Sequence, residues 1–510
     1  MNNLLSPVDI NFGTDGWRAI VGKDFNEDSV RRAARAIACT FFDNLPEVLE
    51  IPGSSSSSGN QPLRIYVGFD TRAGADDFAL IAAQSMARAA HSCEALARRN
   101  QKVQIVLSDR FVPTPTLCWT VARDKCAIGG IQLTASHNPA GWLGIKVRMA
   151  DGGASPAEFT DKIEELLAGE VNVENNVTSN ADLNLTDKQL CTADIFTAYK
   201  DALCQFVDSD AIRRAKLKLV VDPMYGAARG YLADIFEGLD ATVVRLHDDC
   251  SPDFGGLHPE PIPPWTDGAA QLVRESRAQA GFALDGDADR LGALDEDGNF
   301  VSPHQIIALV AQHLVQNRGH SGRIIKTLST SVLVDRVGRI LETEVVTTPI
   351  GFKWIYAEML AGDVLVGGEE SGGIGVPSHV RERDGLLMSL LLAEMMAVTG
   401  QSLKSLVARL EAAVGKLYYQ RRDEKLEQSH MRHFRACLPT LAPAVVAGAD
   451  VQDYIYSDGA KFLLPDDEWL LLRASGTEPL VRIYAESASH VRTEQLIDAG
   501  YRLVQEAATT

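Results

Sequence analysis

The feature that most restricts the fold of this chain is an alternation of short apolar runs with longer stretches of helical periodicity. In the N-terminal part, the runs 64–69, 103–107 and 127–133 read as strands, and 27–42 and 76–99 contain helices. Strands that alternate with helices form a largely parallel sheet with helices packed on it. Ligands bind such sheets at the carboxyl ends of the strands. We therefore expect an α/β fold whose functional residues follow strands.

The length and two polar segments predict how this architecture is divided. A chain of 510 residues exceeds what one hydrophobic core normally serves, so we expect three or four domains. Residues 172–184 are rich in Asn and poor in apolar residues, which is typical of an inter-domain linker or exposed loop. The serine-rich residues 52–59 read as a flexible surface insertion. We predict four domains with the ranges 1–185, 186–300, 301–410 and 411–510.

Composition argues against several classes of partner. The net charge of −19 disfavours nucleic acid or an anionic membrane as the main partner, but it does not exclude a small anionic substrate. The eight cysteines are scattered without a CxxC pair, as in a reduced cytosolic protein. The N-terminus lacks the features of a signal peptide, and no apolar stretch is long enough to span a bilayer. We expect a soluble, cytoplasmic protein that binds neither nucleic acid nor membrane.

A serine follows one of the predicted strands. The turn 134–139, Thr-Ala-Ser-His-Asn-Pro, comes directly after the run 127–133, and Asn-Pro stops regular structure there. The hydroxyl of Ser136 could therefore act as a nucleophile or carry a covalent group. A plain turn is the commoner explanation for small residues before Asn-Pro. Asp70 and Arg72 also follow a strand, and Lys146 lies close in sequence to the turn.

Three aspartates at alternate positions follow another strand. Asp285, Asp287 and Asp289 come after the apolar run 281–284, and three ionised carboxylates so close together need a compensating cation. Oxygen ligands suit a hard divalent ion, Mg2+ before Ca2+. An acidic surface turn and an EF-hand-like loop are the alternatives. The EF-hand is disfavoured because residues 291–294 read as a strand and no helix precedes the aspartates.

Glycines flank two acids and a serine in the segment 367–373, Gly-Gly-Glu-Glu-Ser-Gly-Gly, after the strand 363–366. Glycines let the backbone come close to a polyhydroxylated ligand, and Glu369 and Ser371 can then hydrogen-bond sugar hydroxyls. A polar strand-to-helix turn is the alternative interpretation.

The C-terminal region contains the segment 473–479, Arg-Ala-Ser-Gly-Thr-Glu-Pro. Its candidate phosphate-binding residues are Arg473, Ser475, Gly476 and Thr477. Together they offer charge-assisted and neutral donors to one anion. A β-turn with a surface arginine is the alternative.

Near the N-terminus, residues 11–18 place two glycines around Thr-Asp and end in Arg18. This pattern is typical either of a backbone loop that aims an arginine at an anion, or of a hairpin with a solvated arginine.

The four motifs occur in the order serine turn, aspartate triplet, Gly-Glu-Glu-Ser-Gly and Arg-x-Ser-Gly-Thr-Glu-Pro, one in each predicted domain. This arrangement resembles the α-D-phosphohexomutases over nearly the whole chain, as does the N-terminal Phe-Gly-Thr-Asp-Gly-Trp-Arg. The resemblance implies three related α/β domains with mixed, largely parallel sheets and a smaller α+β C-terminal domain around a central cleft. It implies an intramolecular phosphotransferase, an isomerase that interconverts hexose 1-phosphate and hexose 6-phosphate.

The resemblance also implies a role for each candidate residue. Ser136 would carry a phosphoryl group, and the three aspartates would hold Mg2+ with an oxygen of that phosphoserine. The residues beside the phosphoserine would be Arg18, His137, Lys146 and Arg290. Glu369 and Ser371 would bind sugar hydroxyls. The phosphate that is not transferred would be bound by Arg473, Ser475, Gly476 and Thr477. A sugar 1,6-bisphosphate would be the activator and intermediate.

Substrate preference is implied by smaller features. The segment 348–353, Thr-Pro-Ile-Gly-Phe-Lys, and Glu370 are more similar to the phosphoglucomutase branch than to the phosphoglucosamine branch. Phosphomannomutase or dual specificity stays open, because some family members accept both sugars. Trp142-Leu143 departs from the Tyr-Asn of many members, which affects local contacts and not the chemistry. We expect a hexose phosphate substrate, glucose first, and a monomer or homodimer.

Two other classes of protein would share part of this pattern. A non-catalytic sugar-phosphate binding protein could keep the loops of Glu369 and Arg473, but it would have little reason to keep Ser136 together with the aspartates. A phosphatase that uses a serine phosphoenzyme is the enzymatic alternative.

Overall fold

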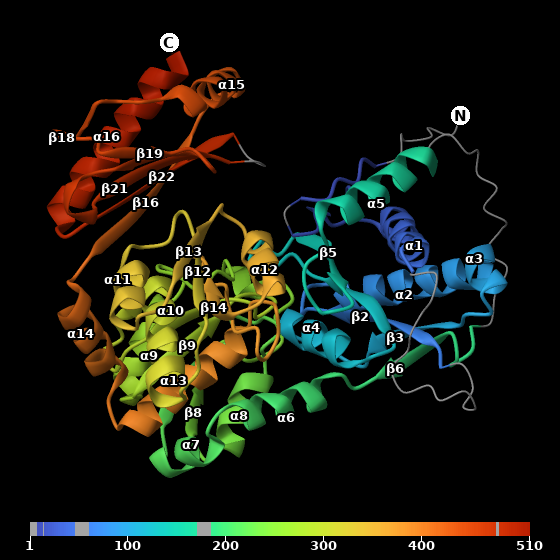
Figure 1. The fold of residues 1–510 in the computed structure, drawn as a ribbon. Coiled ribbons are helices and arrows are strands. Elements are labelled where there is room, and N and C mark those ends of the chain that lie inside the picture. The colour runs from blue at the N-terminus through green and yellow to red at the C-terminus, as the bar shows by residue number, and fades with distance from the viewer. Residues whose placement is uncertain (1–7, 14, 46–60, 171–184, 476–478, 510) are drawn as a thin grey trace.

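The computed structural model describes most of the chain, namely residues 8–13, 15–45, 61–170, 185–475 and 479–509. The segments 52–59 and 172–184, both predicted as exposed loops, lie outside the described residues. Four larger sheets organise the described chain (Figure 1).

The first sheet has six strands among the described residues, in the spatial order β1 (Trp17–Ile20), β5 (Trp142–Met149), β4 (Ala127–Leu133), β2 (Leu63–Phe69), β3 (Val103–Ser108) and β6 (Leu190–Ala193). β4, β2, β3 and β6 run parallel, and β5 and β1 are antiparallel. Its helices are α1 (Glu27–Asp43), α2 (Ala75–Ser92), α3 (Glu94–Arg98), α4 (Thr114–Arg123) and α5 (Ala157–Glu170).

Two local expectations in this region differ from the structure. The helix expected within 76–99 is interrupted at Cys93, whose extended backbone ends α2 and precedes α3. The helix expected near 192–207 begins later, as α6 (Phe196–Phe206), because residues 190–193 pair with β3 as an edge strand. A four-residue edge strand has too short a pattern to be distinguished from a helix start by periodicity.

The second sheet has the order β11 (Phe300–Val301), β10 (Leu291–Leu294), β9 (Ala280–Leu284), β7 (Lys218–Asp222) and β8 (Thr242–Arg245). β9, β7 and β8 are parallel, whereas β9 and β10 form an antiparallel hairpin that carries the aspartate triplet between its strands. Besides α6, its helices are α7 (Ser209–Ala215), α8 (Tyr231–Gly238) and α9 (Asp267–Ser276).

The third sheet has the order β13 (Val345–Thr348), β12 (Arg323–Thr327), β14 (Val364–Gly368) and β15 (Ile374–Gly375), with an antiparallel pair only at β14–β15 among its described pairs. Its helices are α10 (Pro303–Gln312), α11 (Leu333–Ile340), α12 (Phe352–Ala361), α13 (Gly385–Thr399) and α14 (Leu403–Val414). A π-helical turn, His313–Asn317, extends α10.

The C-terminal sheet is antiparallel throughout its described strands. Its order is β16 (Tyr418–Lys425), β22 (Leu480–Ser487), β21 (Trp469–Ala474), β20 (Ala460–Leu463) and β19 (Asp453–Ile455). The helices α15 (Gln428–Cys437) and α16 (His490–Thr509) accompany it, with a small hairpin of β17 (Val445–Val446) and β18 (Ala449–Asp450). Three α/β sheets followed by an antiparallel α+β unit confirm the predicted fold class.

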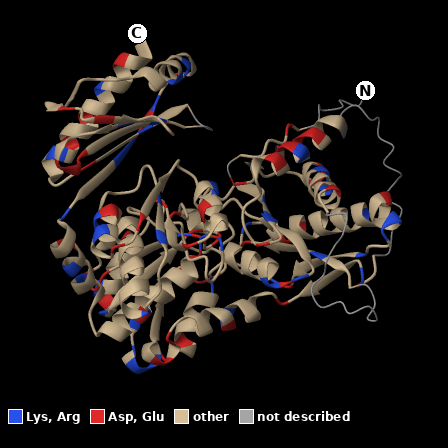
Figure 2. Ribbon diagram, viewed as in Figure 1, with Lys and Arg blue, Asp and Glu red and all other residues tan. Residues whose placement is uncertain are grey.

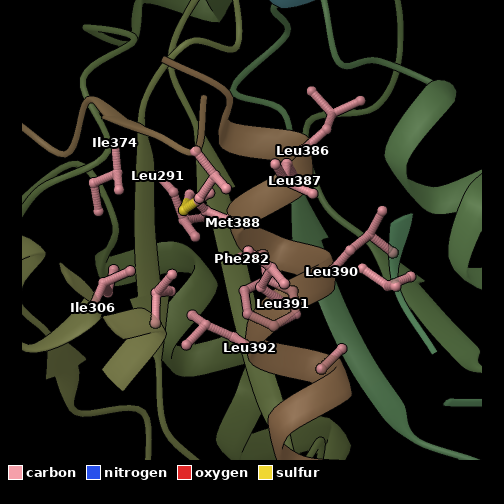
Figure 3. Packing of buried hydrophobic residues seen from close by; sticks show 14 of the residues in the cluster. Phe282, Leu291, Ile306, Ile374, Leu386, Leu387, Met388, Leu390, Leu391 and Leu392 are labelled. Atoms are coloured by element: carbon pink, nitrogen blue, oxygen red, sulfur yellow. The ribbon is translucent and has the colours of Figure 1, made fainter. Parts of the chain in front are cut away.

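One core joins the second and third sheets. Helix α13 is apolar on all sides because neighbours surround it, and its leucines pack against Phe282 of β9, Leu291 of β10 and Ile374 of β15 (Figure 3). Asp384 begins this helix by accepting a hydrogen bond from the Leu387 amide at 2.9 Å. Each fully buried leucine contributes about 1.5–3 kcal/mol of transfer free energy to the core.

We also compared helix length and apolarity with the requirements for a membrane span. Within the described ranges, no single helix is both long and apolar enough to cross a bilayer. The helices α13 and α14 meet the length and composition criteria only as a pair, and the pair is bent by 86°.

Candidate active site

Ser136 lies in a tight turn just beyond β4. Its backbone is in the left-handed region with φ of 49°, and its amide donates to Thr134 Oγ1 at 2.9 Å. The residue is only 1% exposed, so the hydroxyl faces the interior. There Ser136 Oγ donates a hydrogen bond of 2.7 Å to Asp285 Oδ2, a residue 149 positions later. The first and second sheets therefore meet at this hydroxyl.

Arg72 holds the backbone of the serine turn. Its terminal nitrogens donate at 2.6–3.1 Å to the main-chain carbonyls of Ser136, Asn138, Pro139 and Trp142. Asp70 Oδ2 accepts from Arg72 Nε at 3.1 Å, and both side chains are buried. Burial raises the pKa of Asp70 to about 6, although Arg72 opposes the rise. The pair at the end of β2 thus fixes the turn through its main chain.

The aspartate triplet is buried, which contradicts an acidic surface turn. Asp285, Asp287 and Asp289 are each 0% exposed, and one carboxylate oxygen from each lies within 4.8 Å of the others. The loop joins two antiparallel strands and no helix flanks it, so it is not an EF-hand. Gly286 permits the close approach of the serine turn, because a Cβ there would stand 2.4 Å from the Ser136 carbonyl oxygen.

Two cations neutralise part of the triplet. Lys146 Nζ, on β5, lies 2.8 Å from Asp287 Oδ2, 2.9 Å from Asp289 Oδ2 and 3.0 Å from Asp15 Oδ2. Arg383 Nη2 lies 2.8 Å from Asp289 Oδ2 and 2.7 Å from Asp15 Oδ2. Acidic and basic positions gather where these elements meet, near the middle of the view in Figure 2. Asp15 therefore bridges two buried cations.

The carboxylates of the triplet are in different electrostatic states. Burial, and then the charges of Asp289 and Asp287, raise the pKa of Asp285 well above its usual range. Burial would also raise the pKa of Asp287, but the Lys146 ammonium and its hydrogen bond lower it below its usual range. Among the described atoms, Asp287 Oδ1 and Asp289 Oδ1 are buried without a hydrogen-bond partner. Unsatisfied buried oxygens on converging carboxylates fit a hard divalent cation.

Three other predicted residues lie against this cluster, namely Arg18, His137 and Arg290. Arg18 Nη1 donates to Asn138 Oδ1 at 2.8 Å, so it is directed at the serine turn and is not a solvated hairpin residue. The Arg290 amide donates to Asp285 Oδ1 at 3.0 Å, and its Nε lies 3.8 Å from Asp289 Oδ1. His137 Nδ1 is 3.5 Å from Ser136 Oγ. Burial, with Arg290 and Arg18, holds the pKa of His137 well below its usual range, so the ring is neutral.

The glycine-flanked acidic loop reaches the same cluster through Arg383. Glu369 follows β14 and is 6% exposed, and its Oε2 lies 3.8 Å from Arg383 Nη1. Burial raises the pKa of Glu369 to about 7, against the attraction of Arg383. A bridge between Arg290 and Gly373 joins this loop to the aspartate loop. Ser371, two residues after Glu369, is partly exposed.

The predicted phosphate-binding segment lies apart from these residues, at the end of β21 in the C-terminal sheet (Figure 1). Arg473 Nε donates to Asp458 Oδ1 at 3.0 Å, and the Ser475 amide donates to the Leu480 carbonyl at 2.9 Å. Arg435 also contacts the Ser475 carbonyl. The other two predicted residues, Gly476 and Thr477, lie outside the described residues.

Sequence reasoning missed Asp15 and Arg383 as members of the cluster. Arg383 lies in the charged run 381–384, which by pattern alone reads as a solvated face, yet it is only 6% exposed. Asp15 stands in the N-terminal motif, where Arg18 was the residue selected. A charged run directly before an apolar, fully buried helix was the available signal for Arg383, because the run must enter the core together with α13.

All four domains of one protein family match this chain. The models described as phosphoglucomutase/phosphomannomutase alpha/beta/alpha domains I, II and III match residues 9–174, 197–298 and 302–413, and the C-terminal domain model matches 421–502.

Individual relatives agree with these matches. A phosphoglucomutase/phosphomannomutase of Thermococcus kodakarensis is 30% identical over 404 residues, covering 79% of this chain and 84% of the relative. A phosphoglucosamine mutase of Fusobacterium nucleatum is 26% identical, covering 93% and 94%. The crystal structure of a protein named putative phosphomannomutase, from Thermus thermophilus, superposes with a TM-score of 0.79 at 32% identity, covering 98% and 99%.

Proposed function

The chain belongs to the α-D-phosphohexomutase family, and from this premise we propose that it interconverts hexose 1-phosphate and hexose 6-phosphate, with glucose as the preferred sugar. The reaction proceeds through a phosphoryl group on Ser136 and a bisphosphorylated sugar. The observation that carries this proposal is the 2.7 Å hydrogen bond from Ser136 Oγ to Asp285. It places the candidate phosphoryl carrier on the edge of a buried carboxylate cluster.

The carboxylate cluster is the proposed Mg2+ site. Asp285, Asp287 and Asp289, with an oxygen on Ser136, would hold the ion, and their unsatisfied oxygens support this ligand set. When bound, Mg2+ offsets negative charge on a transferring phosphoryl group. Lys146 and Arg290 add positive charge beside it, and their contacts with the triplet keep both side chains in place. Arg18 approaches from the side of Asn138.

The proposed transfer conserves the phosphoryl group. A sugar hydroxyl oxygen forms a bond to phosphorus as the bond from phosphorus to Ser136 Oγ breaks, and the hydroxyl proton ends on Ser136 Oγ. The structure has the serine in this unmodified form, with its proton donated to Asp285. The bisphosphorylated sugar then returns its other phosphoryl group to Ser136 by the reverse exchange. Because both ends of the sugar react in turn, the protein must bind the substrate in two orientations.

Two further segments would bind the substrate away from the reacting atoms. Glu369 and Ser371 would accept and donate hydrogen bonds to the sugar hydroxyls, and the contact from Glu369 to Arg383 holds this loop near the aspartates. The non-reacting phosphate would be bound by Arg473, Ser475, Gly476 and Thr477. The same residues would serve both orientations, because a phosphate occupies that position in each.

The choice of glucose rests on the segment 348–353 and on Glu370, the residue between the two proposed sugar ligands. Thr327 Oγ1 donates to Glu370 Oε2 at 3.3 Å, so the carboxylate of Glu370 is fixed beside the loop. A phosphomannomutase or a dual-specificity mutase is the first alternative. Phosphoglucosamine is the next, because a relative named for that substrate matches nearly the full length of the chain.

Intact mass and a substrate panel test the proposal together. We expect one phosphoryl group on the purified protein after exposure to a sugar 1,6-bisphosphate, the proposed activator. Glucose 1-phosphate should then be turned over faster than mannose 1-phosphate and glucosamine 1-phosphate. Phosphorylated protein that releases inorganic phosphate without isomerisation would indicate a phosphatase. Binding without phosphorylation or turnover would indicate a sugar-phosphate binding protein.

The remaining parts of the proposal concern organisation and location. We propose a reducing, cytoplasmic location, which the free thiol state of all eight cysteines supports. The four domain ranges and the monomeric or homodimeric state stay predictions, as does the absence of nucleic acid and membrane partners.

The raised pKa of Glu369 predicts how substrate affinity depends on pH. The carboxyl is protonated below about pH 7 and ionised above it, and an ionised acceptor makes the stronger hydrogen bonds to sugar hydroxyls. The Michaelis constant for glucose 1-phosphate should therefore fall as pH rises from 6 to 8. Glu369→Gln should raise that constant by about tenfold at pH 8 and remove the Glu369 component of the profile.

The control for this experiment is Glu344→Gln, an exposed acid in the same domain. Ionisation of the substrate phosphate affects every variant equally, so the difference between profiles isolates Glu369. If the wild-type and Glu369→Gln profiles had the same shape, the carboxyl of Glu369 would not be the group that contacts the sugar.

Arg473→Ala is expected to weaken substrate binding and to leave the serine chemistry in place. Losing a charge-assisted contact to phosphate costs roughly 1.5–3 kcal/mol, about one to two decades in affinity. The Michaelis constant for glucose 1-phosphate should rise by that factor, while intact mass still finds the phosphoryl group on Ser136. Some loss of turnover is also expected, because the C-terminal domain would close over the substrate. Arg502→Ala, on the exposed face of α16, is the matched control, and an unchanged constant would show that Arg473 points elsewhere.

A further inference from the structure

We propose that Asp458 is a positioning residue for the phosphate-binding segment, which sets the direction of the Arg473 guanidinium and ties it to the loop after β13. The inference rests on the proposed function of Arg473. It adds a residue that lies outside all of the motifs from which the site was derived.

The carboxylate of Asp458 has one oxygen for each of two domains. Asp458 Oδ1 accepts from Arg473 Nε at 3.0 Å, within the C-terminal sheet. Asp458 Oδ2 accepts from the backbone amide of Ile350 at 2.9 Å, in the third α/β unit. Both contacts have the length of a good hydrogen bond, and each uses a different oxygen, so they can exist together.

The turn between β19 and β20 is built to approach Arg473. Gly459, the next residue, has a φ of +105°, and a Cβ on it would stand 2.5 Å from the Leu472 carbonyl oxygen. A side chain at that position would push the turn away from β21. The glycine therefore brings Asp458 close to the point where β21 delivers Arg473.

The second contact lies at the boundary between the third and fourth units. Ile350 packs against a small buried cluster formed by Leu328, Trp469, Leu471 and Tyr484. It directly precedes Gly351, the residue before α12, and belongs to the segment 348–353 on which the choice of sugar rests. Asp458 thus joins the arginine of the phosphate segment to the loop at the sugar end of the substrate.

Electrostatics favour positioning as the reason for this carboxylate. A negative charge beside Arg473 repels a phosphate dianion, so a purely electrostatic phosphate site would be stronger without it. The contact uses Nε, and a guanidinium can still bind a phosphate through its two terminal nitrogens. Fixing Nε removes rotational freedom from a long side chain before the substrate arrives. The gain is one of geometry at the expense of local charge.

Binding and kinetics of Asp458→Ala distinguish these two effects. If Asp458 positions Arg473, the dissociation constant of glucose 6-phosphate by calorimetry and the Michaelis constant should both rise by about 5- to 30-fold, with turnover changed by about threefold or less. If the carboxylate mainly repels phosphate, both constants should fall, and the proposal would be wrong. Asp458→Asn keeps an acceptor for the Ile350 amide and should have an intermediate effect.

A double variant shows whether Asp458 acts through Arg473. In Arg473→Ala the positioning role has no object, so adding Asp458→Ala should cause no further increase in either constant. Effects that multiply would mean that Asp458 acts independently of the arginine. Asp453→Ala, an exposed acid at the start of β19, is the matched control and should behave as the wild type.

The calorimetric titration also separates this inference from the proposed function. Wild-type protein that binds glucose 6-phosphate without turning it over would contradict the mutase activity, yet Asp458 would still be tested by its effect on binding. Wild-type turnover with an unchanged Asp458→Ala variant would contradict the positioning role alone.

Discussion

Ser136→Ala is expected to abolish mutase activity, lowering turnover by roughly three decades or more. The proposed phosphoryl carrier is its hydroxyl oxygen, and removal of a covalent carrier leaves the enzyme without the first of its two transfers. Substrate binding should persist, since Arg473 and Glu369 lie on other elements. The measurement is steady-state turnover of glucose 1-phosphate with added 1,6-bisphosphate, together with intact mass of the same sample.

The fold should survive this substitution. Arg72 holds the turn through main-chain carbonyls, including that of Ser136 itself, and alanine keeps all of these acceptors. The lost side-chain contact is the hydrogen bond to Asp285. Circular dichroism and the thermal midpoint should therefore stay close to the wild-type values. Ser92→Ala, near the end of α2 in the same domain, controls for loss of a hydroxyl. Near-normal turnover by the Ser136 variant would exclude a phosphoserine mechanism.

The sequence predicted the contact between Ser136 and Asp285 only indirectly. Each residue follows an apolar run, and the rule that ligands gather at strand ends applies within one sheet. β4 and β9 belong to different sheets, so periodicity could not state that their ends meet. The shared appearance of both motifs in one family supplied that step. Physical pattern gave the elements, and their mutual placement needed the whole fold.

Buried charge explains what the sequence could not reveal. Arg383 and Asp15 look like solvent-exposed residues by composition, because charged side chains are rarely buried unless paired. Their partners lie hundreds of positions away, as with the 368 positions between Arg383 and Asp15. Asp458 was missed for the same reason, since its carboxylate acts on a backbone amide of another domain. A local reading of charge cannot find long-range partners.

Removal of divalent metal is the second change with a large expected effect. Turnover in excess chelator should fall by roughly two decades or more, and Mg2+ should restore it, because the phosphoryl group would lose its principal counter-charge. Full activity in chelator would mean that the aspartate loop is only a structural cluster. Asp285→Asn should reproduce the loss in the presence of Mg2+. Asp297→Asn, an exposed acid in the following turn, is the control.

Thermal stability tests the same site without relying on activity. Three carboxylates lie within 4.8 Å of one another in the interior, so a bound cation relieves repulsion in the folded state alone. Mg2+ at about a hundred times its dissociation constant should stabilise the protein by about 2.7 kcal/mol and raise the unfolding midpoint by several degrees. The described contacts of Asp285 are to Ser136 and to the Arg290 amide, so Asp285→Asn leaves the ion pairs of Lys146 and Arg383 intact. Its midpoint without metal should match or exceed that of the wild type, and it should no longer rise with Mg2+. An equal rise in the wild type and the variant would place the bound ion elsewhere.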